Sequence, residues 1–191
     1  MASKPGERKA QILRSLADML EQPRAARITT AALAAHMQVS EAALYRHFAS
    51  KAQMFDSLIE FIETTLSAQI SQITRNEPSG LAQVRRIAAT LLAFAEQNRG
   101  MTRVLTGDAL VTEDPRLQER LNHIGERIEA SFRQSVRTAI SDGGLRNQAE
   151  AADYASLLTH FVLGRWLRYA QSGWRIAPSE RLDEQLNLIL R

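Results

Sequence analysis

Residues 28–51 combine hydroxyl, small, aromatic and basic side chains at helical spacing, a combination suited to contact with a nucleic acid. Small side chains allow close approach to base edges and pack against thymine methyl groups, and an arginine can bind a guanine or a phosphate. The face expected to enter a major groove is formed by Glu41, Ala42, Ala43 and Arg46. The expected contacts to the DNA backbone are Thr29, Thr30, Ser40, Tyr45, His47 and Lys51.

Two short helices separated by a tight turn must position these side chains. Thr29 and Ser40 are expected N-caps of helices that end near Met37 and His47. The capped start of the second helix can also present backbone N–H groups to a phosphate. Four apolar side chains have the spacing of a small core that fixes the angle between the helices, namely Leu33, Val39, Leu44 and Phe48. This layout indicates a DNA-reading helix-turn-helix.

Each contact has an ordinary structural alternative. A tyrosine or histidine beside a phenylalanine often only packs, and Thr29 and Ser40 can be caps and nothing more. The charge distribution favours the DNA interpretation, although a short segment can show such an excess by chance. Residues 1–52 carry eight basic and four acidic side chains, whereas the remainder carries 16 basic and 17 acidic ones.

Composition argues against several other classes. The chain has no cysteine, which excludes disulfides and thiolate chemistry. His36, His123 and His160 are isolated on different expected helices, so we expect no metal site and no cofactor. A glycine-rich phosphate loop and a serine-nucleophile motif are both missing, which argues against an enzyme. No apolar run reaches the roughly 20 residues of a membrane span, so we expect a cytoplasmic protein.

Helical periodicity extends over nearly the whole chain. We predict an all-α fold of about nine helices, with a three-helix DNA-binding domain in residues 1–52 and a helical domain for dimerisation and partner binding in residues 53–191. The expected helices are 7–21 (ended by Pro23), 30–37, 41–47, 51–73, 79–97, 101–110, 115–141, 149–171 and 178–190. Ser50 and Gln53 form a capping-box pattern. Gly107 and Gly125 fall within expected helices, where close helix packing is the simplest account.

The string SEAALYRHFASKAQMF resembles the helix-turn-helix of TetR-family regulators, which commonly ends in Leu-Tyr-x-His/Tyr-Phe followed by Ser/Asn-Lys. The nine-helix layout is similar to that family along the full chain. Gln38 stands where the family commonly has a turn glycine. A left-handed residue other than glycine costs about 1 kcal/mol, so we expect a slightly different turn.

Residues 27–63, 103–110 and 114–130 further resemble the nucleoid occlusion factors of this family. That resemblance implies a nucleoid-associated homodimer, paired through the last two helices, that binds chromosomal sites and antagonises the tubulin-like division protein FtsZ. The implied FtsZ contact is a groove between the fourth and fifth helices, at Phe61, Gln69, Ala93 and Gln97. The last three depart from the family's arginine, glycine and arginine, and nearby Arg85, Arg86 and Arg99 offer compensating charge.

Two alternatives stay open. The abundant apolar side chains of residues 51–73 fit burial on two faces as well as a partner groove, and those of the last two helices fit a monomer core as well as a dimer interface. The protein is then either a DNA-bound division inhibitor or a TetR-type repressor released from its operator by a small ligand. An internal apolar pocket with a few polar groups would favour the repressor.

Overall fold

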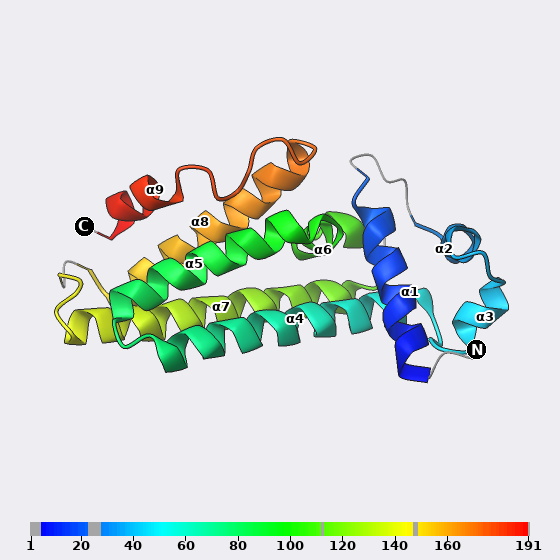
Figure 1. The fold of residues 1–191 in the computed structure, drawn as a ribbon, viewed down its shortest axis with the longest axis horizontal. Coiled ribbons are helices and arrows are strands. Elements are labelled where there is room, and N and C mark those ends of the chain that lie inside the picture. Colours follow the sequence, from blue (N-terminus) through cyan, green and yellow to red (C-terminus); the bar gives the residue numbers. More distant parts are fainter. Residues whose placement is uncertain (1–4, 23–27, 112, 147–148, 191) are drawn as a thin grey trace. The chain divides into compact units, whose positions relative to one another are not determined.

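The computed structural model describes residues 5–22, 28–111, 113–146 and 149–190, which form nine α-helices and one 3-10 helix (Figure 1). The helices are α1 (Pro5–Leu20), α2 (Thr30–His36), α3 (Glu41–Tyr45), α4 (Lys51–Asn76), α5 (Gly80–Gln97), α6 (Arg99–Leu105), η1 (Asp108–Leu110, 3-10), α7 (Pro115–Ser141), α8 (Ala151–Gln171) and α9 (Leu182–Ile189). This confirms the predicted all-α class. The expected helix end at Pro23 lies outside the described residues.

The chain forms two compact units. The first contains residues 1–62 and 98–121, and the second contains residues 63–97 and 122–191. The boundary predicted after residue 52 falls near the start of α4, and the division into a DNA-binding and a dimerisation domain stays a prediction.

Helix starts in the first unit follow from hydroxyl caps. The side-chain oxygens of Thr29, Ser40 and Ser50 each accept a hydrogen bond from the backbone N–H three residues further on, at 3.1, 3.3 and 3.1 Å. Each bond satisfies a donor that the helix itself leaves unpaired. The Gln53 amide oxygen accepts from the Ala49 N–H, so the box at the start of α4 closes one residue earlier than the standard pattern.

The turn between α2 and α3 is a Schellman motif built around Gln38. Gln38 has φ 56°, its N–H donates to the Ala35 carbonyl, and the Val39 N–H donates to the Ala34 carbonyl, each at 3.0 Å. The turn therefore keeps the left-handed form that glycine usually adopts, and the expectation of a different form was wrong. Leu33, Leu44 and Phe48 are buried as predicted, whereas Val39 is only half-buried.

The helices of the first unit are joined by a close contact between α1 and α6. A Cβ added to Gly100 would lie 1.9 Å from the Ala17 carbonyl oxygen, so only glycine allows the two backbones to meet here. The Arg103 guanidinium donates to the Gln22 carbonyl at 2.8 Å and forms an ion pair with Asp108. The segment after α6 is thereby tied to the end of α1, and α1 in turn contacts α2.

Three helix predictions need correction. Gly107 has φ 77° and ends α6, so the expected helix 101–110 is broken and resumes as η1. Pro178 lies in a turn and α9 starts only at Leu182, because Arg181 adopts a left-handed conformation with φ 54°. A Cβ added to Gly125 would meet nothing within 4 Å, so close packing does not explain that glycine.

The second unit is held by buried contacts among its helices. The Trp166 indole N–H on α8 donates to the Leu91 carbonyl on α5 at 3.0 Å, within the core. Arg165 of α8 donates to the Glu180 carbonyl at 3.0 Å and to the Gln185 amide oxygen at 2.6 Å. These bonds hold the turn before α9 on α8 and account for the late start of that helix.

The Asp142 carboxylate, just after α7, fixes the start of α5. It accepts from the Gly80 N–H at 2.8 Å and from the Gly144 N–H at 2.9 Å. Because both donors favour the charged form, they lower the pKa of Asp142, with Gly80 the larger cause. Across the described parts of the chain, no helix combines the length and the hydropathy needed to cross a bilayer.

Candidate nucleic-acid interface

The exposed face of α3 carries the side chains predicted to read bases. Glu41, Ala42 and Arg46 are exposed and Ala43 is half-buried, while Leu44 beneath them is 1% exposed. The buried leucine anchors the helix, and the small alanines leave the surface low enough for close approach to a groove. This face belongs to a helix-turn-helix with the standard order of helix, turn and second helix.

Three of the predicted DNA contacts are hydrogen-bonded to one another across α2 and α3. The Thr30 hydroxyl donates to Glu41 Oε2 at 2.6 Å, and the Tyr45 hydroxyl lies 3.4 Å from Thr30 Oγ1 as a donor. Tyr45 remains 47% exposed despite this contact. Sequence reasoning placed these residues on one surface but did not predict that they would bind each other.

Lys51 is already paired within the protein. Its ammonium group forms an ion pair with Glu113, and the two side chains are 19% and 8% exposed. The ammonium group also lies 5.5 Å from the centre of the Phe55 ring. A phosphate contact by Lys51 therefore requires this pair to open. Glu113 is 62 residues away in sequence, so no local pattern pointed to it.

The side chains predicted to bind the division protein differ in exposure. In the first unit, Phe61 on α4 is 52% exposed. In the second unit, Gln97 is exposed, whereas Gln69 and Ala93 are half-buried. The Gln69 amide oxygen is buried without a hydrogen-bond partner among the described residues.

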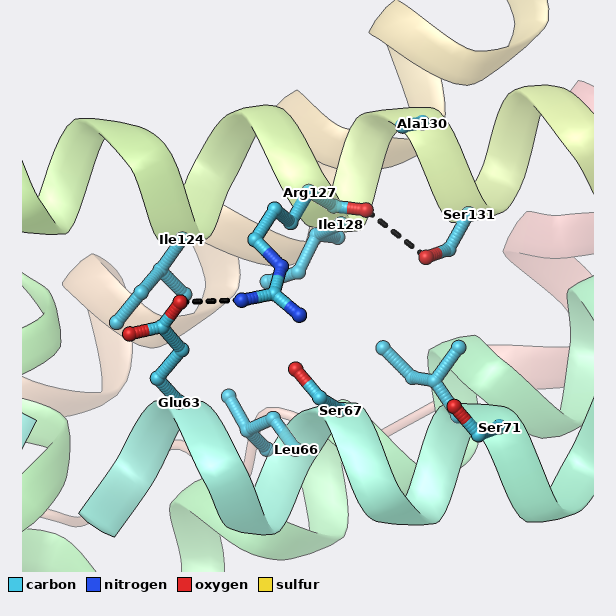
Figure 2. A pocket seen from close by; sticks show the side chains of 10 residues that line it. Glu63, Leu66, Ser67, Ser71, Ile124, Arg127, Ile128, Ala130 and Ser131 are labelled. Carbon is cyan, nitrogen blue, oxygen red and sulfur yellow. Dashed lines mark hydrogen bonds and ion pairs between the residues drawn. The ribbon is translucent and has the colours of Figure 1, made fainter. Parts of the chain in front are cut away.

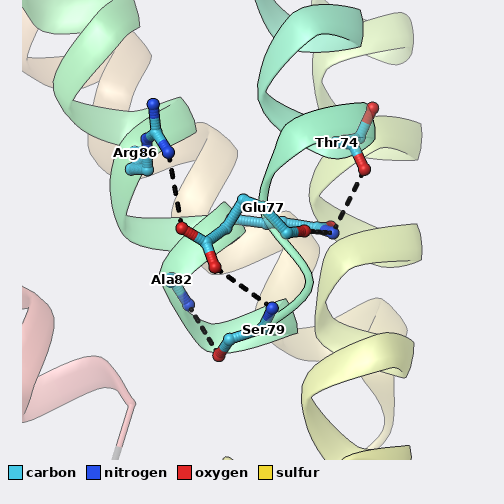
Figure 3. Close-up of polar contacts among 6 residues, drawn as sticks. Thr74, Glu77, Ser79, Ala82 and Arg86 are labelled. Atoms are coloured by element: carbon cyan, nitrogen blue, oxygen red, sulfur yellow. Dashed lines mark hydrogen bonds and ion pairs between the residues drawn. The ribbon is translucent and has the colours of Figure 1, made fainter.

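The connection between α4 and α5 fixes these helices within the second unit (Figure 3). The Gln83 amide donates to the Glu77 carbonyl at 2.7 Å, and the Glu77 carboxylate accepts from Arg86 at 3.4 Å and from the Ser79 N–H at 3.2 Å. Arg85 donates to the Asn187 side chain at 2.6 Å. Two of the arginines expected to supply compensating charge are thus engaged in intramolecular contacts.

A hollow of about 270 Å³ lies between α4 and α7 in the second unit (Figure 2). Its floor includes Leu66 and Ile128, and its rim carries Ser67 and the ion pair between Glu63 and Arg127. The hollow has a polar rim and is open to solvent. It differs from the internal apolar pocket that would favour a ligand-released repressor.

Comparisons with known proteins agree with this architecture. Residues 12–58 match the family model for bacterial regulatory proteins of the tetR family, and residues 79–191 match the SlmA-like, tetracyclin repressor-like C-terminal domain. The fatty acid degradation regulator FadR of Bacillus halodurans has a TM-score of 0.80 at 9% identity, covering 100% of this chain and 97% of that one. The MbdR regulator of Azoarcus sp. CIB has a TM-score of 0.79 at 17% identity, covering 95% and 96%. Fold and motif together define a TetR-type DNA-binding regulator.

Relatives that are similar in sequence place the chain in a smaller family within the TetR-type regulators. The nucleoid occlusion factor SlmA of Marinomonas sp. (strain MWYL1) is 44% identical over 189 residues, covering 99% of this chain and 96% of that protein. The SlmA of Pectobacterium carotovorum subsp. carotovorum (strain PC1) is 45% identical over 183 residues, covering 95% and 92%. The chain belongs to the SlmA family of nucleoid occlusion factors. This membership confirms the predicted DNA-binding function and the prediction that the protein is not an enzyme.

Proposed function

We propose that this protein binds chromosomal sites as a homodimer and, while bound to DNA, antagonises assembly of the FtsZ ring over the nucleoid. The observation that carries the proposal is the 44% identity to a nucleoid occlusion factor over nearly the full length of both chains. The exposed helix-turn-helix supplies the DNA-binding surface that such a factor needs.

The DNA surface consists of the face of α3 together with the start of α2. Glu41, Ala42, Ala43 and Arg46 face the bases in this proposal. The proposed contacts to the sugar-phosphate backbone are Thr29, Thr30, Ser40, Tyr45, His47 and Lys51. Lys51 binds a phosphate only in exchange for its ion pair with Glu113.

Dimerisation through α8 and α9 accounts for apolar side chains exposed on both helices. Leu157 and Leu167 on α8 are 52% and 43% exposed, and Leu188 on α9 is 62% exposed. Gly164 also lies on the exposed side of α8, where an added Cβ meets nothing within 4 Å. A second copy covering this surface would bury the leucines and give the two-fold symmetry that a pair of half-sites requires.

Phe61 is the residue on which we place the contact with FtsZ, together with Gln69, Ala93 and Gln97. An aromatic side chain that is half exposed on a helix is a common anchor for a protein partner. Replacing it should leave the core intact, because the neighbouring Ile59 and Ile62 are the buried side chains there.

The test is a sedimentation assay of FtsZ polymers with this protein bound to its DNA site. We expect the wild type to reduce polymer mass and Phe61→Ala to lose about tenfold or more of that effect, with DNA affinity unchanged. The exposed neighbour Glu60→Ala is the matched control and should behave as wild type. An unfolded Phe61→Ala protein would instead assign Phe61 to the core, and equal activity in both variants would remove it from the contact.

A further inference from the structure

Glu41 is the one acidic side chain among the residues that we propose to face DNA, and it stands exposed at the first position of α3. DNA carries a dense row of phosphates, so a carboxylate at this place opposes binding to any sequence. The helix start favours a negative charge, but the neutral Ser40 already caps this helix without repelling DNA. The presence of Glu41 on this face therefore indicates a role in DNA recognition.

The contacts of Glu41 show which hydroxyl group its carboxylate binds. The Thr30 hydroxyl donates its hydrogen to Glu41 Oε2 at 2.6 Å, and the Tyr45 hydroxyl points its own hydrogen at Thr30 Oγ1 at 3.4 Å. A hydroxyl has one hydrogen to donate. The Thr30 hydroxyl, which we propose to bind a phosphate oxygen, thus donates its hydrogen to a carboxylate oxygen in the role of a phosphate oxygen.

We propose that Glu41 is a specificity-determining residue that keeps Thr30 from binding the backbone of arbitrary DNA. This inference rests on the proposed DNA surface. The Thr30 hydroxyl can donate to a phosphate only when the carboxylate leaves it, and a carboxylate facing the groove is stable only where a base donates to it. The amino group of cytosine is such a donor in the major groove.

Binding to the correct site therefore exchanges two bonds at once. The Glu41 carboxylate moves from the Thr30 hydroxyl to a base amino group, and the freed Thr30 hydroxyl binds the backbone. On DNA that offers no donor at this position, the carboxylate stays unpaired near phosphates or stays on Thr30 and withholds its hydroxyl. Discrimination arises from this penalty against wrong sequences as well as from the favourable contact.

The experiment measures affinity by fluorescence anisotropy for two probes, a pool of random-sequence duplexes and the tightest duplex selected from that pool. Glu41→Gln should bind the random pool about threefold more tightly per subunit, and so about tenfold for a dimer, because a neutral amide oxygen holds the Thr30 hydroxyl more weakly than a carboxylate and one exposed charge is also removed on each copy. Affinity for the selected duplex should stay level or fall, so the ratio of the two affinities falls about tenfold or more. Glu119→Gln, with the same change at an exposed position on α7, should match the wild type.

A double-mutant cycle separates the hydrogen-bond network from bulk charge. In a Thr30→Val background, Glu41→Gln should tighten random-pool binding by clearly less than threefold per subunit, because no hydroxyl remains to be freed. Equal effects in both backgrounds, or equal gains on random and selected duplexes, would overturn the proposal. If the wild type bound neither duplex, the proposed DNA surface itself would fail, which distinguishes that outcome from a failure of this inference.

Discussion

At the scale of single residues, the DNA-facing side chains fall into two groups. Thr30, Tyr45 and Lys51 are bonded within the protein, whereas Arg46 at the end of α3 is exposed. Residues of the first group must exchange partners on binding DNA. The Arg46 side chain is exposed to solvent in the free protein and is the clearest candidate for direct base contact.

Replacing Arg46 with alanine tests whether it reads a base. A bidentate contact to guanine contributes about 1–3 kcal/mol of discrimination, so Arg46→Ala should lose that amount on the selected duplex and little on random DNA. Binding titrations on both duplexes over a range of salt concentrations give the measurement. Equal losses on both, with a salt slope reduced by about one unit per subunit, would show that Arg46 instead holds a phosphate.

The left-handed turn residue Gln38 predicts a gain in stability on substitution. Gln38→Gly should raise the free energy of unfolding by about 1 kcal/mol, because glycine adopts φ 56° without the cost of a Cβ. The melting temperature should then rise by about 2–4 °C. Gln38→Ala keeps the Cβ and serves as the control. A comparable rise in both variants would show that the backbone conformation is not the cause.

At the scale of helices, the contact of α6 with α1 carries the orientation of the helix-turn-helix within its unit. Gly100→Ala should cost about 2 kcal/mol of stability, because the added methyl group would overlap the Ala17 carbonyl. Weaker DNA binding should follow, since α1 also contacts α2. Gly125→Ala is the matched control, as its methyl group meets nothing and alanine favours the helix by about 0.5–1 kcal/mol. Chemical denaturation that gave equal effects for the two variants would contradict the close contact.

The start of α5 gives a prediction for pH. Two backbone N–H groups lower the pKa of the Asp142 carboxyl, so its stabilising effect is present above the pKa of the unfolded chain. That effect is lost as the pH falls through the lower pKa of the folded protein. Asp142→Asn should therefore melt below the wild type at neutral pH, and the gap should narrow in acid. Asp18→Asn, at an exposed site on α1, should show no such gap. A gap that stayed constant with pH would assign the effect to packing.

Local sequence signals predicted most helix starts. Hydroxyls at Thr29, Ser40 and Ser50 cap the helices expected from them, and α7 runs over the predicted 115–141. The misses have two causes. Gly107 fits a helix or its end equally well on pattern alone, whereas the turn before α9 depends on bonds from Arg165, 15 residues away from Glu180.

For the candidate site, the sequence likewise predicts a surface from local residue types but does not predict the pairing of its side chains. The composition and spacing of residues 40–51 predict the DNA-reading face, because base and phosphate contact demand particular residue types, and the individual contacts stay predictions. The sequence did not show that Glu41 binds Thr30 or that Glu113 binds Lys51. Those pairs depend on how α2, α3 and the segment before α7 are placed in space, which no local pattern encodes.

At the scale of the whole molecule, the proposed nucleoid occlusion function predicts action at many places on a chromosome. A factor that prevents division over the nucleoid needs binding sites spread across the DNA over which the cell must not divide. A promoter repressor needs only one or two. The distribution of bound sites therefore separates these two functions.

The most direct measurement is chromatin immunoprecipitation of this protein from its own host, followed by sequencing. We predict many sites, within genes as well as between them, and a depletion around the replication terminus, where division must be allowed. Glu41→Gln in the same experiment should raise the background between sites. One or two sites at a promoter, with no wider distribution, would contradict nucleoid occlusion and indicate a local repressor.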